Sequence, residues 1–291
     1  MTEAATDTKP LIGPKIALMG LGGTGKTYAL GTLAEWAERN GFELAILFTE
    51  NSLETFLGYF RDPPPDSKRV AREPPACIYW HQQLTRPVSL KAMTSMADSI
   101  GKLSYESITK LADANRGENN AFWRILASCA DFVDDRTGKK LGPVDSFPAN
   151  RIFAMDSLTE TSNAAMKMQV GARPTASPGD YGVAQGALMN FLRLCTQGIN
   201  CPFIMTAHVD RELEPVSGLP KTMIKAVGKA LATEIPTLFS EMIYTVREGN
   251  SWYWDQAAFG VDVKSRYLPY RTKITPDLGQ IMDAWKKRSG A

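Results

Sequence analysis

The stretch Gly20-Leu-Gly-Gly-Thr-Gly25-Lys26-Thr27 matches the pattern G-x-x-x-x-G-K-S/T at every position. It lies between an apolar run that predicts a buried strand and an amphipathic run that predicts a helix. Glycines let the backbone bend so that successive N–H groups face inward, and the start of the helix adds positive potential at the same place. The stretch therefore predicts a phosphate-binding loop, or P-loop, rather than an ordinary glycine-rich turn.

The side chains of this loop predict ATP and Mg²⁺ as cofactors. Lys26 is expected to reach the β- and γ-phosphates, and the Thr27 hydroxyl is expected to be a ligand of Mg²⁺. The other expected nucleotide contacts are Gly20, Gly22, Gly23, Thr24, Gly25 and Tyr28.

Two acids that follow predicted strands are the catalytic candidates. Asp156 ends the apolar run 151–155 and is expected to be the second protein ligand of Mg²⁺, although an acid there could also cap the next helix. Glu50 follows the strand predicted next after the P-loop helix. A carboxylate there could align or deprotonate the attacking water, or it could cap the next helix with Asn51.

Strand and helix patterns alternate along much of the chain. Strands are expected at 15–19, 42–49, 76–84, 151–155 and 202–206, and helices at 25–39, from 158, at 181–196 and at 278–287. Because parallel strands need crossover connections, this order predicts an α/β fold with a mostly parallel sheet flanked by helices. Residues 242–247, 252–259 and 261–267 predict an antiparallel meander that extends the sheet at the C-terminal end.

The rest of the chain suggests a flexible leader over 1–13 and a single domain over 14–291. Proline-rich connections and long helical patterns predict a helical insertion over about 61–149, a candidate surface for a protein partner. The composition is 44% hydrophobic and 22% charged with a net charge of +2, which fits a globular protein and gives no global case for nucleic acid.

Several protein classes are disfavoured. No apolar run approaches the roughly 20 residues that span a bilayer, and the polar start lacks the pattern of an export signal. The four cysteines never form a CxxC pair, which argues against a zinc knuckle or a disulfide framework and favours reduced thiols in a cytoplasm.

The order of the motifs resembles RecA-like recombinase cores. The P-loop is followed by Phe48-Thr-Glu50-Asn51, Met155-Asp156-Ser157, Phe203-Ile-Met-Thr206-Ala-His208 and Gly228-Lys-Ala-Leu231. Asp156-Ser157-Leu158-Thr159 and Thr206-Ala207-His208 are similar to phage-encoded RecA-like ATPases, including core-only recombinases of the single-strand-annealing type. The resemblance covers about 14–60 and 150–275, and it implies a RecA-like P-loop ATPase, in the host cytoplasm if phage-encoded.

The resemblance also implies residue roles. Glu50 matches the water-activating glutamate of the family, and His208 takes the place of the polar residue that senses the γ-phosphate. Recombinases usually carry Gln there, so His208 departs from the pattern, and a lone His after a strand can also be purely structural.

Two loops of the family reach single-stranded DNA, and here they correspond to 171–180, with Arg173, and 209–226, with Arg211, Lys221 and Lys225. Such cations would give sequence-tolerant, salt-sensitive binding. Acids dilute the second loop, and Tyr181 is the nearest aromatic residue on which a base could stack.

The tail occupies the place from which recombinases present cations to a neighbour's nucleotide in a homo-oligomer. Arg271, Lys264 and Arg266 are the candidates, with a solvated strand face as the alternative. The aromatic run Trp252-Tyr-Trp254 is interpreted as core or interface rather than as a platform for bases.

The leading hypothesis is an ATPase whose hydrolysis is coupled to single-stranded DNA in recombination, repair or replication. The alternatives are an ATP-dependent assembly or regulatory switch that acts on a protein, and a kinase-like phosphotransferase, which is disfavoured because no arginine-rich lid is present.

Overall fold

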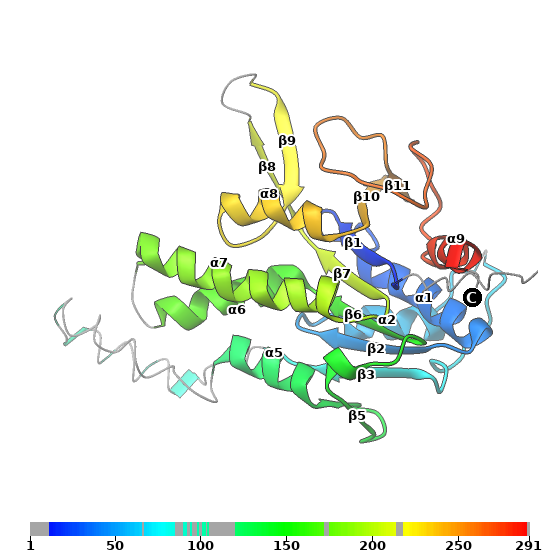
Figure 1. The fold of residues 1–291 in the computed structure, drawn as a ribbon, viewed down its shortest axis with the longest axis horizontal. Coiled ribbons are helices and arrows are strands. Elements are labelled where there is room, and N and C mark those ends of the chain that lie inside the picture. The colour runs from blue at the N-terminus through cyan, green and yellow to red at the C-terminus, as the bar shows by residue number, and fades with distance from the viewer. Residues whose placement is uncertain are drawn as a thin grey trace, which may run out of the picture.

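The computed structural model describes residues 12–65, 67–84, 90–91, 94, 98, 101–102, 104, 120–171, 175–213 and 218–289. Among these residues, seven strands form the central sheet in the order β11-β10-β1-β7-β6-β2-β3 (Figure 1). The strands are β1 (Lys15–Met19), β2 (Glu43–Phe48), β3 (Ile78–Gln82), β6 (Arg151–Asp156), β7 (Phe203–Ala207), β10 (Glu241–Glu248) and β11 (Ser251–Asp255). All neighbours pair in parallel except β10 and β11, which are antiparallel.

The central strands are apolar on both faces because helices cover both faces. In β1, Ile16 and Leu18 point to one side while Ala17 and Met19 point to the other, and all four are fully buried. This explains why the strand is a continuous apolar run in the sequence rather than an alternating one.

Helices α1 (Lys26–Asn40), α2 (Leu53–Arg61) and α9 (Gly279–Ser289) cover one face of the sheet. Trp36 of α1, Phe56 of α2 and Met282 of α9 pack against the side chains of Ile16 and Leu18 in one apolar cluster. Gly41 ends α1 with a φ of 71°, a left-handed conformation that favours glycine.

The opposite face is covered by α5 (Ala121–Ala130), α6 (Leu158–Val170), α7 (Pro178–Arg193) and α8 (Lys229–Leu238). A short π-helix follows α7 at Leu194–Gly198, and a 3-10 turn lies at Val144–Ser146. Strands β4 (Phe132–Val133) and β5 (Lys140–Gly142) form a small separate pair.

The expectation of an irregular loop over 209–226 is wrong. Strands β8 (Val209–Leu213) and β9 (Pro220–Ile224) pair antiparallel and form a ribbon that projects from the body of the protein (Figure 1). Its glycine and prolines suggested a loop, but Val209 pairs with Ile224 and both are buried in the core at the base of the ribbon. This anchor keeps the two segments in register, since a slip of one residue would turn both side chains outward.

Two element boundaries also differ from expectation. The meander has two strands, because 261–267 makes only isolated bridges, at Thr222–Val261 and Met242–Lys264. The helix expected from 181 begins at Pro178, where Ser177 and Asp180 form a capping box.

The fold class is confirmed by the topology: a mostly parallel sheet with helices on both faces, extended by the antiparallel strand β11. Within the predicted insertion 61–149, the described residues include β3 of the main sheet as well as α5 and the β4–β5 pair. Most of 85–119 lies outside the described residues, so the helical insertion stays a prediction. In the part of the chain that the structure describes, every helix is too short or too polar to cross a membrane.

Candidate nucleotide-binding site

The predicted P-loop connects β1 to α1, and its glycines have the conformations that a tight loop requires. Gly23 and Gly25 have φ angles of 72° and 84°. At Gly20 the loop passes so close to β10 that an added Cβ would lie 2.1 Å from Thr245 Oγ1. Thr24 Oγ1 and Thr245 Oγ1 are 2.7 Å apart, so β10 also holds the middle of the loop.

Lys26 lies under the loop rather than in solvent. It is 7% exposed, and its Nζ donates to the carbonyl oxygens of Gly20 at 3.0 Å and Leu21 at 2.8 Å. Burial lowers the pKa of Lys26, and the nearby carboxylates of Asp156 and Glu50 oppose that shift. The ammonium is therefore confined to the loop, where phosphate oxygens could replace the two carbonyl oxygens.

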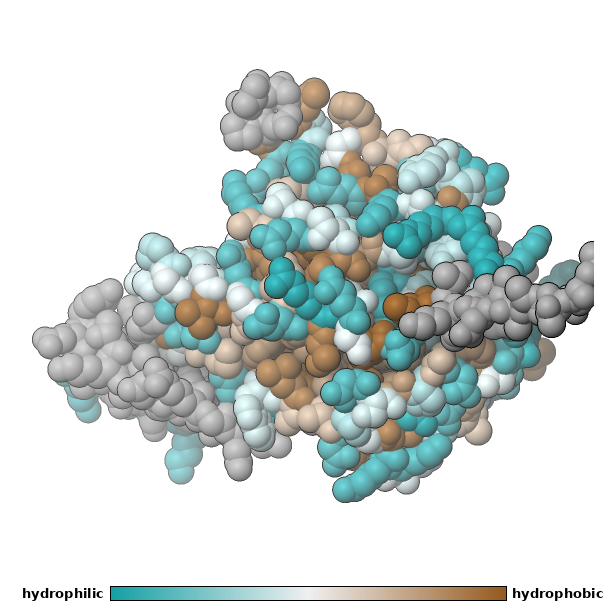
Figure 2. All heavy atoms as spheres, viewed as in Figure 1, coloured by the Kyte–Doolittle hydropathy of each residue, from teal (hydrophilic) through white to brown (hydrophobic). Residues whose placement is uncertain are grey.

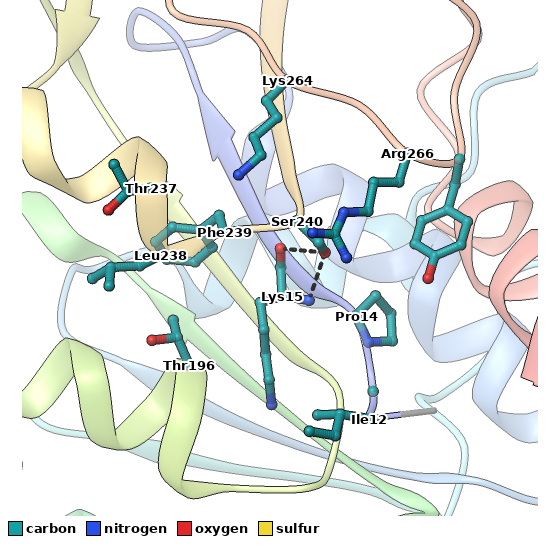
Figure 3. A pocket seen from close by; sticks show the side chains of 12 residues that line it. Ile12, Pro14, Lys15, Thr196, Thr237, Leu238, Phe239, Ser240, Lys264 and Arg266 are labelled. Carbon is teal, nitrogen blue, oxygen red and sulfur yellow. Dashed lines mark hydrogen bonds between the residues drawn. The ribbon is translucent and has the colours of Figure 1, made fainter. Parts of the chain in front are cut away.

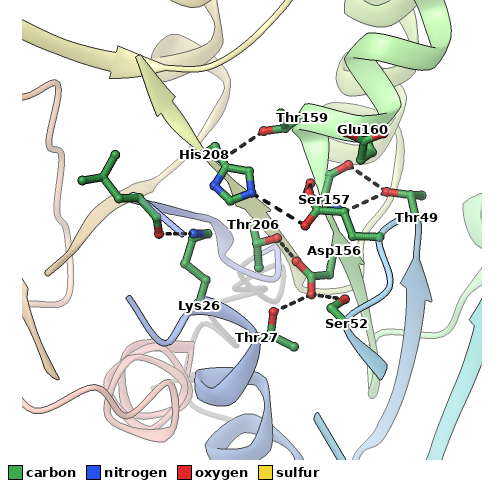
Figure 4. Close-up of polar contacts among 12 residues, drawn as sticks. Lys26, Thr27, Thr49, Ser52, Asp156, Ser157, Thr159, Glu160, Thr206 and His208 are labelled. Carbon is green, nitrogen blue, oxygen red and sulfur yellow. Dashed lines mark hydrogen bonds and ion pairs between the residues drawn. The ribbon is translucent and has the colours of Figure 1, made fainter. Parts of the chain in front are cut away.

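Asp156 lies at the end of β6, directly beside the start of α1 (Figure 4). Its Oδ2 accepts hydrogen bonds from Thr27 at 2.7 Å and Ser52 at 2.8 Å, and its Oδ1 accepts one from Thr206. The residue is 2% exposed, so these hydroxyls replace the water that a buried carboxylate has lost. The structure thus brings the two predicted Mg²⁺ ligands, Thr27 and Asp156, into direct contact.

Glu50 lies near Ser157, the residue after Asp156, and near His208, which is labelled in Figure 4. Ser157 Oγ donates to Glu50 Oε1, and His208 Nε2 is 3.7 Å from Glu50 Oε2, which is longer than a hydrogen bond. The backbone N–H of His208 donates to Thr159 Oγ1 at 2.9 Å, which fixes the residue after β7. Asp156 and Ser157 are joined by a cis peptide bond.

Ser52, Thr206 and Ser157 were not predicted as site residues from the sequence. Hydroxyl residues carry no motif of their own, and Ser52 is two residues beyond Glu50 in a loop that precedes α2. The available signal was positional, because the carboxyl ends of neighbouring parallel strands meet at one edge of a sheet. Residues that directly follow β2, β6 and β7 should therefore have been considered as one group.

Tyr28 lies one residue beyond the P-loop and contacts α2. Its ring packs edge-on against Tyr59, with centroids 4.7 Å apart, and its hydroxyl accepts a hydrogen bond from Arg69. The guanidinium of Arg69 stacks 3.9 Å above the Tyr59 ring. The structure therefore gives Tyr28 a packing role, and its predicted contact with the nucleotide stays a prediction.

The DNA-binding candidates on the ribbon are close together but tied to other side chains. Lys225 lies 3.6 Å from Asp210, and Lys221 lies 3.7 Å from Asp262. Arg211 donates to the Tyr244 hydroxyl at 3.3 Å. Arg173 lies outside the described residues.

The cations predicted to act in trans lie away from the P-loop of their own chain. Lys264 and Arg266 line a depression of about 200 Å³ with Pro14 and Lys15, at the end of β1 opposite to the P-loop (Figure 3). Arg271 is exposed, and its carbonyl accepts the N–H of Gln256 just past the end of β11, at the sheet edge. The structure does not bring any of the three to the site in the same chain.

The atoms of this site that could bind a metal ion are hydroxyl and carboxylate oxygens. Among the residues that the structure describes, no group of three or more His, Cys, Asp or Glu side chains could hold a metal ion by itself. The four cysteines are free thiols, and Cys129, Cys195 and Cys201 are buried. The Nδ1 of His81, near the end of β3, lies 2.7 Å from Asp135 Oδ1.

The glycine loop connects β1 to α1, and the aspartate that contacts Thr27 lies on β6, two strands away in the sheet. No protein-family model and no curated protein matches the chain. Solved structures that are similar include the RadB recombinase, with a TM-score of 0.40 and 12% identity over 90% of this chain and 86% of that one.

An ATPase from the type III secretion system of pathogenic bacteria has a TM-score of 0.40 and 15% identity over 81% of this chain. The assembled secretion ATPase EscN from enteropathogenic E. coli has a TM-score of 0.37 and 14% identity over 81% of this chain. The chain spans 53% of the first of these proteins and 43% of EscN.

Proposed function

We propose that this protein binds ATP with Mg²⁺ at the P-loop and hydrolyses it. The observation that carries the proposal is the 2.7 Å contact between Thr27 Oγ1 and the buried carboxylate of Asp156, beside the confined ammonium of Lys26. A glycine loop alone would bind many anions. A hydroxyl and a carboxylate placed together next to it also provide for a divalent cation.

The residues present fit Mg²⁺, which prefers hard oxygen ligands and takes few of them from the protein. Thr27 and Asp156 would hold the ion, with Ser52 and Thr206 orienting the carboxylate through its other hydrogen bonds. When bound, the ion would neutralise charge on the β- and γ-phosphates.

Hydrolysis also requires a group that accepts a proton from water, and Glu50 is the best placed side chain. Its carboxylate is a quarter exposed, and Ser157 holds one of its oxygens. His208, with its Nε2 3.7 Å from the second oxygen, lies where its ring could donate a hydrogen bond to the γ-phosphate or to Glu50. An acid in this position distinguishes an ATPase from a protein that merely binds nucleotide.

The test is direct measurement of MgATP binding and of phosphate release in the parent and in Lys26→Ala. The parent should bind MgATP and release phosphate, while Lys26→Ala should lose binding or turnover at an unchanged circular dichroism spectrum. If the folded parent has no affinity for any nucleoside triphosphate with Mg²⁺ present, the proposal is wrong.

We further propose that the ATPase acts on single-stranded DNA through the β8–β9 ribbon. The ribbon begins at Val209, next to His208, and Lys225 N donates to the His208 carbonyl at 2.8 Å. A movement of His208 when the γ-phosphate is lost would therefore be transmitted to the base of the ribbon. Its cations are Arg211, Lys221 and Lys225. The two lysines form ion pairs with Asp262 and Asp210 near the surface, which are weak enough to be exchanged for phosphates, and Arg211 donates to the Tyr244 hydroxyl.

Anisotropy of labelled single-stranded DNA, measured over a range of salt with and without ATP, tests this step. Replacing Arg211, Lys221 and Lys225 together with Ala should weaken binding and reduce the salt slope by up to about 2, since each phosphate contact contributes roughly 0.7. Replacing Lys286 and Lys287 on α9 is the matched control and should change neither quantity. Negligible binding at low salt in every nucleotide state would exclude the DNA proposal.

A protein partner is the second candidate, and one observation favours it. Leu213 and Leu219, on either side of the tip of the ribbon, are 70% and 47% exposed, and apolar side chains are visible there in Figure 2. The ion pairs of the ribbon also reduce its positive charge. If DNA fails to bind, retention of an ATP-dependent protein complex by the parent and its loss in Leu213→Ser would support this candidate.

A further inference from the structure

One residue of the aromatic run 252–254, which the sequence suggested to be core or interface, lies against the P-loop. Trp254 is 1% exposed and belongs to the core, as predicted, whereas Trp252, on the same side of β11, is 45% exposed. The indole Nε1 of Trp252 donates to the carbonyl oxygen of Gly23 at 3.0 Å. Its Cδ1 lies 3.4 Å from the position that a Cβ on Gly25 would occupy. An exposed aromatic ring thus covers the outer side of the phosphate loop.

Arg247 lies directly across from Trp252 in the β10–β11 pair. Its guanidinium stands 5.1 Å from the centre of the indole ring, and its Nε donates to the Gly249 carbonyl at 3.0 Å. Its Nη1 also lies 3.9 Å from the position of a Cβ on Gly23. Within the described residues Arg247 makes no ion pair with an acid, so its charge is not committed to another side chain.

We propose that Trp252 and Arg247 together form the platform on which the base of the nucleotide stacks. This inference rests on the proposed function, because it assigns the nucleoside part of the same site. The inward N–H groups of the loop and the start of α1 account for the phosphates. The nucleoside must continue outside the loop, and the indole and the guanidinium are flat groups at the outer side of Gly23 and Gly25.

The chemistry of the platform defines the class of ligand. Indole and guanidinium planes stack on any base and make few bonds that distinguish one base from another. Larger bases gain more contact area, so the platform favours purine nucleoside triphosphates over pyrimidine ones, with little preference between adenine and guanine.

A different role must be separated from this one. The bond from Trp252 Nε1 to Gly23 could simply support the loop, in which case loss of the indole would weaken the binding of every phosphate ligand alike. A ligand that carries the phosphates without a base therefore provides the decisive comparison. Inorganic tripolyphosphate with Mg²⁺ is such a ligand.

The experiment measures equilibrium binding of MgATP and of Mg-tripolyphosphate to the parent, Trp252→Ala and Trp252→Phe. Trp252→Ala should bind ATP about tenfold more weakly, in line with stacking on aromatic residues, and should bind tripolyphosphate within about twofold of the parent. Trp252→Phe should retain most of the ATP affinity, because it keeps a flat ring while losing the bond to Gly23. Trp123→Ala removes an equally exposed indole, 49% accessible on α5, and should change neither ligand.

Three outcomes would overturn the platform while leaving the proposed function intact. These are an equal loss of both ligands in Trp252→Ala, an unchanged affinity for both, and an ATP affinity of Trp252→Phe as low as that of Trp252→Ala. A folded parent that binds neither ligand would instead overturn the proposed function itself, so the two failures are distinguishable.

Discussion

Asp156 occupies a buried position whose hydrogen bonds come from three hydroxyl groups on three different elements. Thr27 lies in the first turn of α1, Ser52 precedes α2 and Thr206 lies on β7. The carboxylate therefore links the starts of two helices to the neighbouring strand. Hydroxyl groups donate hydrogen bonds to the carboxylate but carry no charge, whereas Lys or Arg would neutralise it. The carboxylate therefore keeps its capacity to attract a divalent cation.

Glu50 is the residue whose replacement should separate binding from hydrolysis. Glu50→Gln keeps the size of the side chain and its contact with Ser157 but cannot accept a proton, so ATP turnover should fall about 10²–10⁴-fold while MgATP affinity stays within a few-fold. Phosphate release and nucleotide binding are measured on the same samples. Glu54→Gln, an exposed acid in the first turn of α2, is the control and should retain full turnover.

Equal turnover in Glu50→Gln and the parent would remove Glu50 from the mechanism. His208, whose Nε2 lies 3.7 Å from Glu50, would then be the next side chain to replace.

Gly20 is required for close packing rather than for flexibility. A Cβ at this position would lie 2.1 Å from Thr245 Oγ1 and 2.6 Å from the Thr245 carbonyl oxygen. Gly20→Ala must push the loop away from β10, and overpacking of this kind costs about 1–3 kcal/mol. Thermal unfolding should show a Tm several degrees lower, whereas Gly22→Ala, with nothing within 4 Å of its added Cβ, should be close to the parent. Equal Tm values for the two variants would contradict this account.

At the scale of elements, β1 carries the P-loop at one end and a buried lysine at the other. Lys15 is 5% exposed, and its Nζ donates to the carbonyl oxygens of Ile199 at 2.9 Å and Cys201 at 2.6 Å. The ammonium thereby ties the start of β1 to the segment that leads into β7. Burial lowers the pKa of Lys15 to about 8.

This lowered pKa predicts how stability changes with pH. Above pH 8 the folded protein loses the proton of Lys15, while the unfolded chain keeps it up to about pH 10.4. The unfolded state therefore binds more protons in this window, and the free energy of unfolding should rise with pH through this group. Urea unfolding at pH 7 and pH 9.5 should show the parent gaining about 1–3 kcal/mol relative to Lys15→Met, in which the group is absent. Parallel changes in the two proteins would show that Lys15 does not titrate in this way.

The elements show what the sequence could and could not predict. The buried strands and the P-loop were predictable, because apolar runs and glycine spacing are local signals. The β8–β9 ribbon was not, since its identity depends on pairing between 209–213 and 220–224 and on the burial of Val209 and Ile224. The position of Trp252 was missed for a similar reason. Alternation along β11 places it on the same side as Trp254, which is in the core. Only the pairing of β11 with β10 shows that Trp252 lies beside the P-loop instead.

At the scale of the whole molecule, the side chains predicted to act on the nucleotide lie in two separate places. Lys26, Glu50 and Asp156 lie where the parallel strands end, whereas Lys264 and Arg266 lie beside the start of β1. The backbone of Lys264 pairs with Met242, beside the middle of β1, but both side chains line the depression at the start of that strand rather than the P-loop. We expect these cations, if they act on a nucleotide, to act on that of a second copy in the predicted homo-oligomer.

An experiment that mixes two inactive variants tests whether Arg266 acts on the nucleotide of a neighbouring copy. We expect Arg266→Ala and Lys26→Ala each to lose most ATP turnover alone, because the first lacks the cation and the second lacks a working P-loop. In a mixture, the P-loop of the Arg266→Ala copy can meet the cation of the Lys26→Ala copy, so turnover should recover to a substantial fraction of the parent rate. A mixture of Lys26→Ala with Glu50→Gln should not recover, since both defects lie at the same end and every site contains one. If the first mixture stays as inactive as its components, or if Arg266→Ala alone turns over ATP at the parent rate at every protein concentration, then Arg266 does not act across an interface.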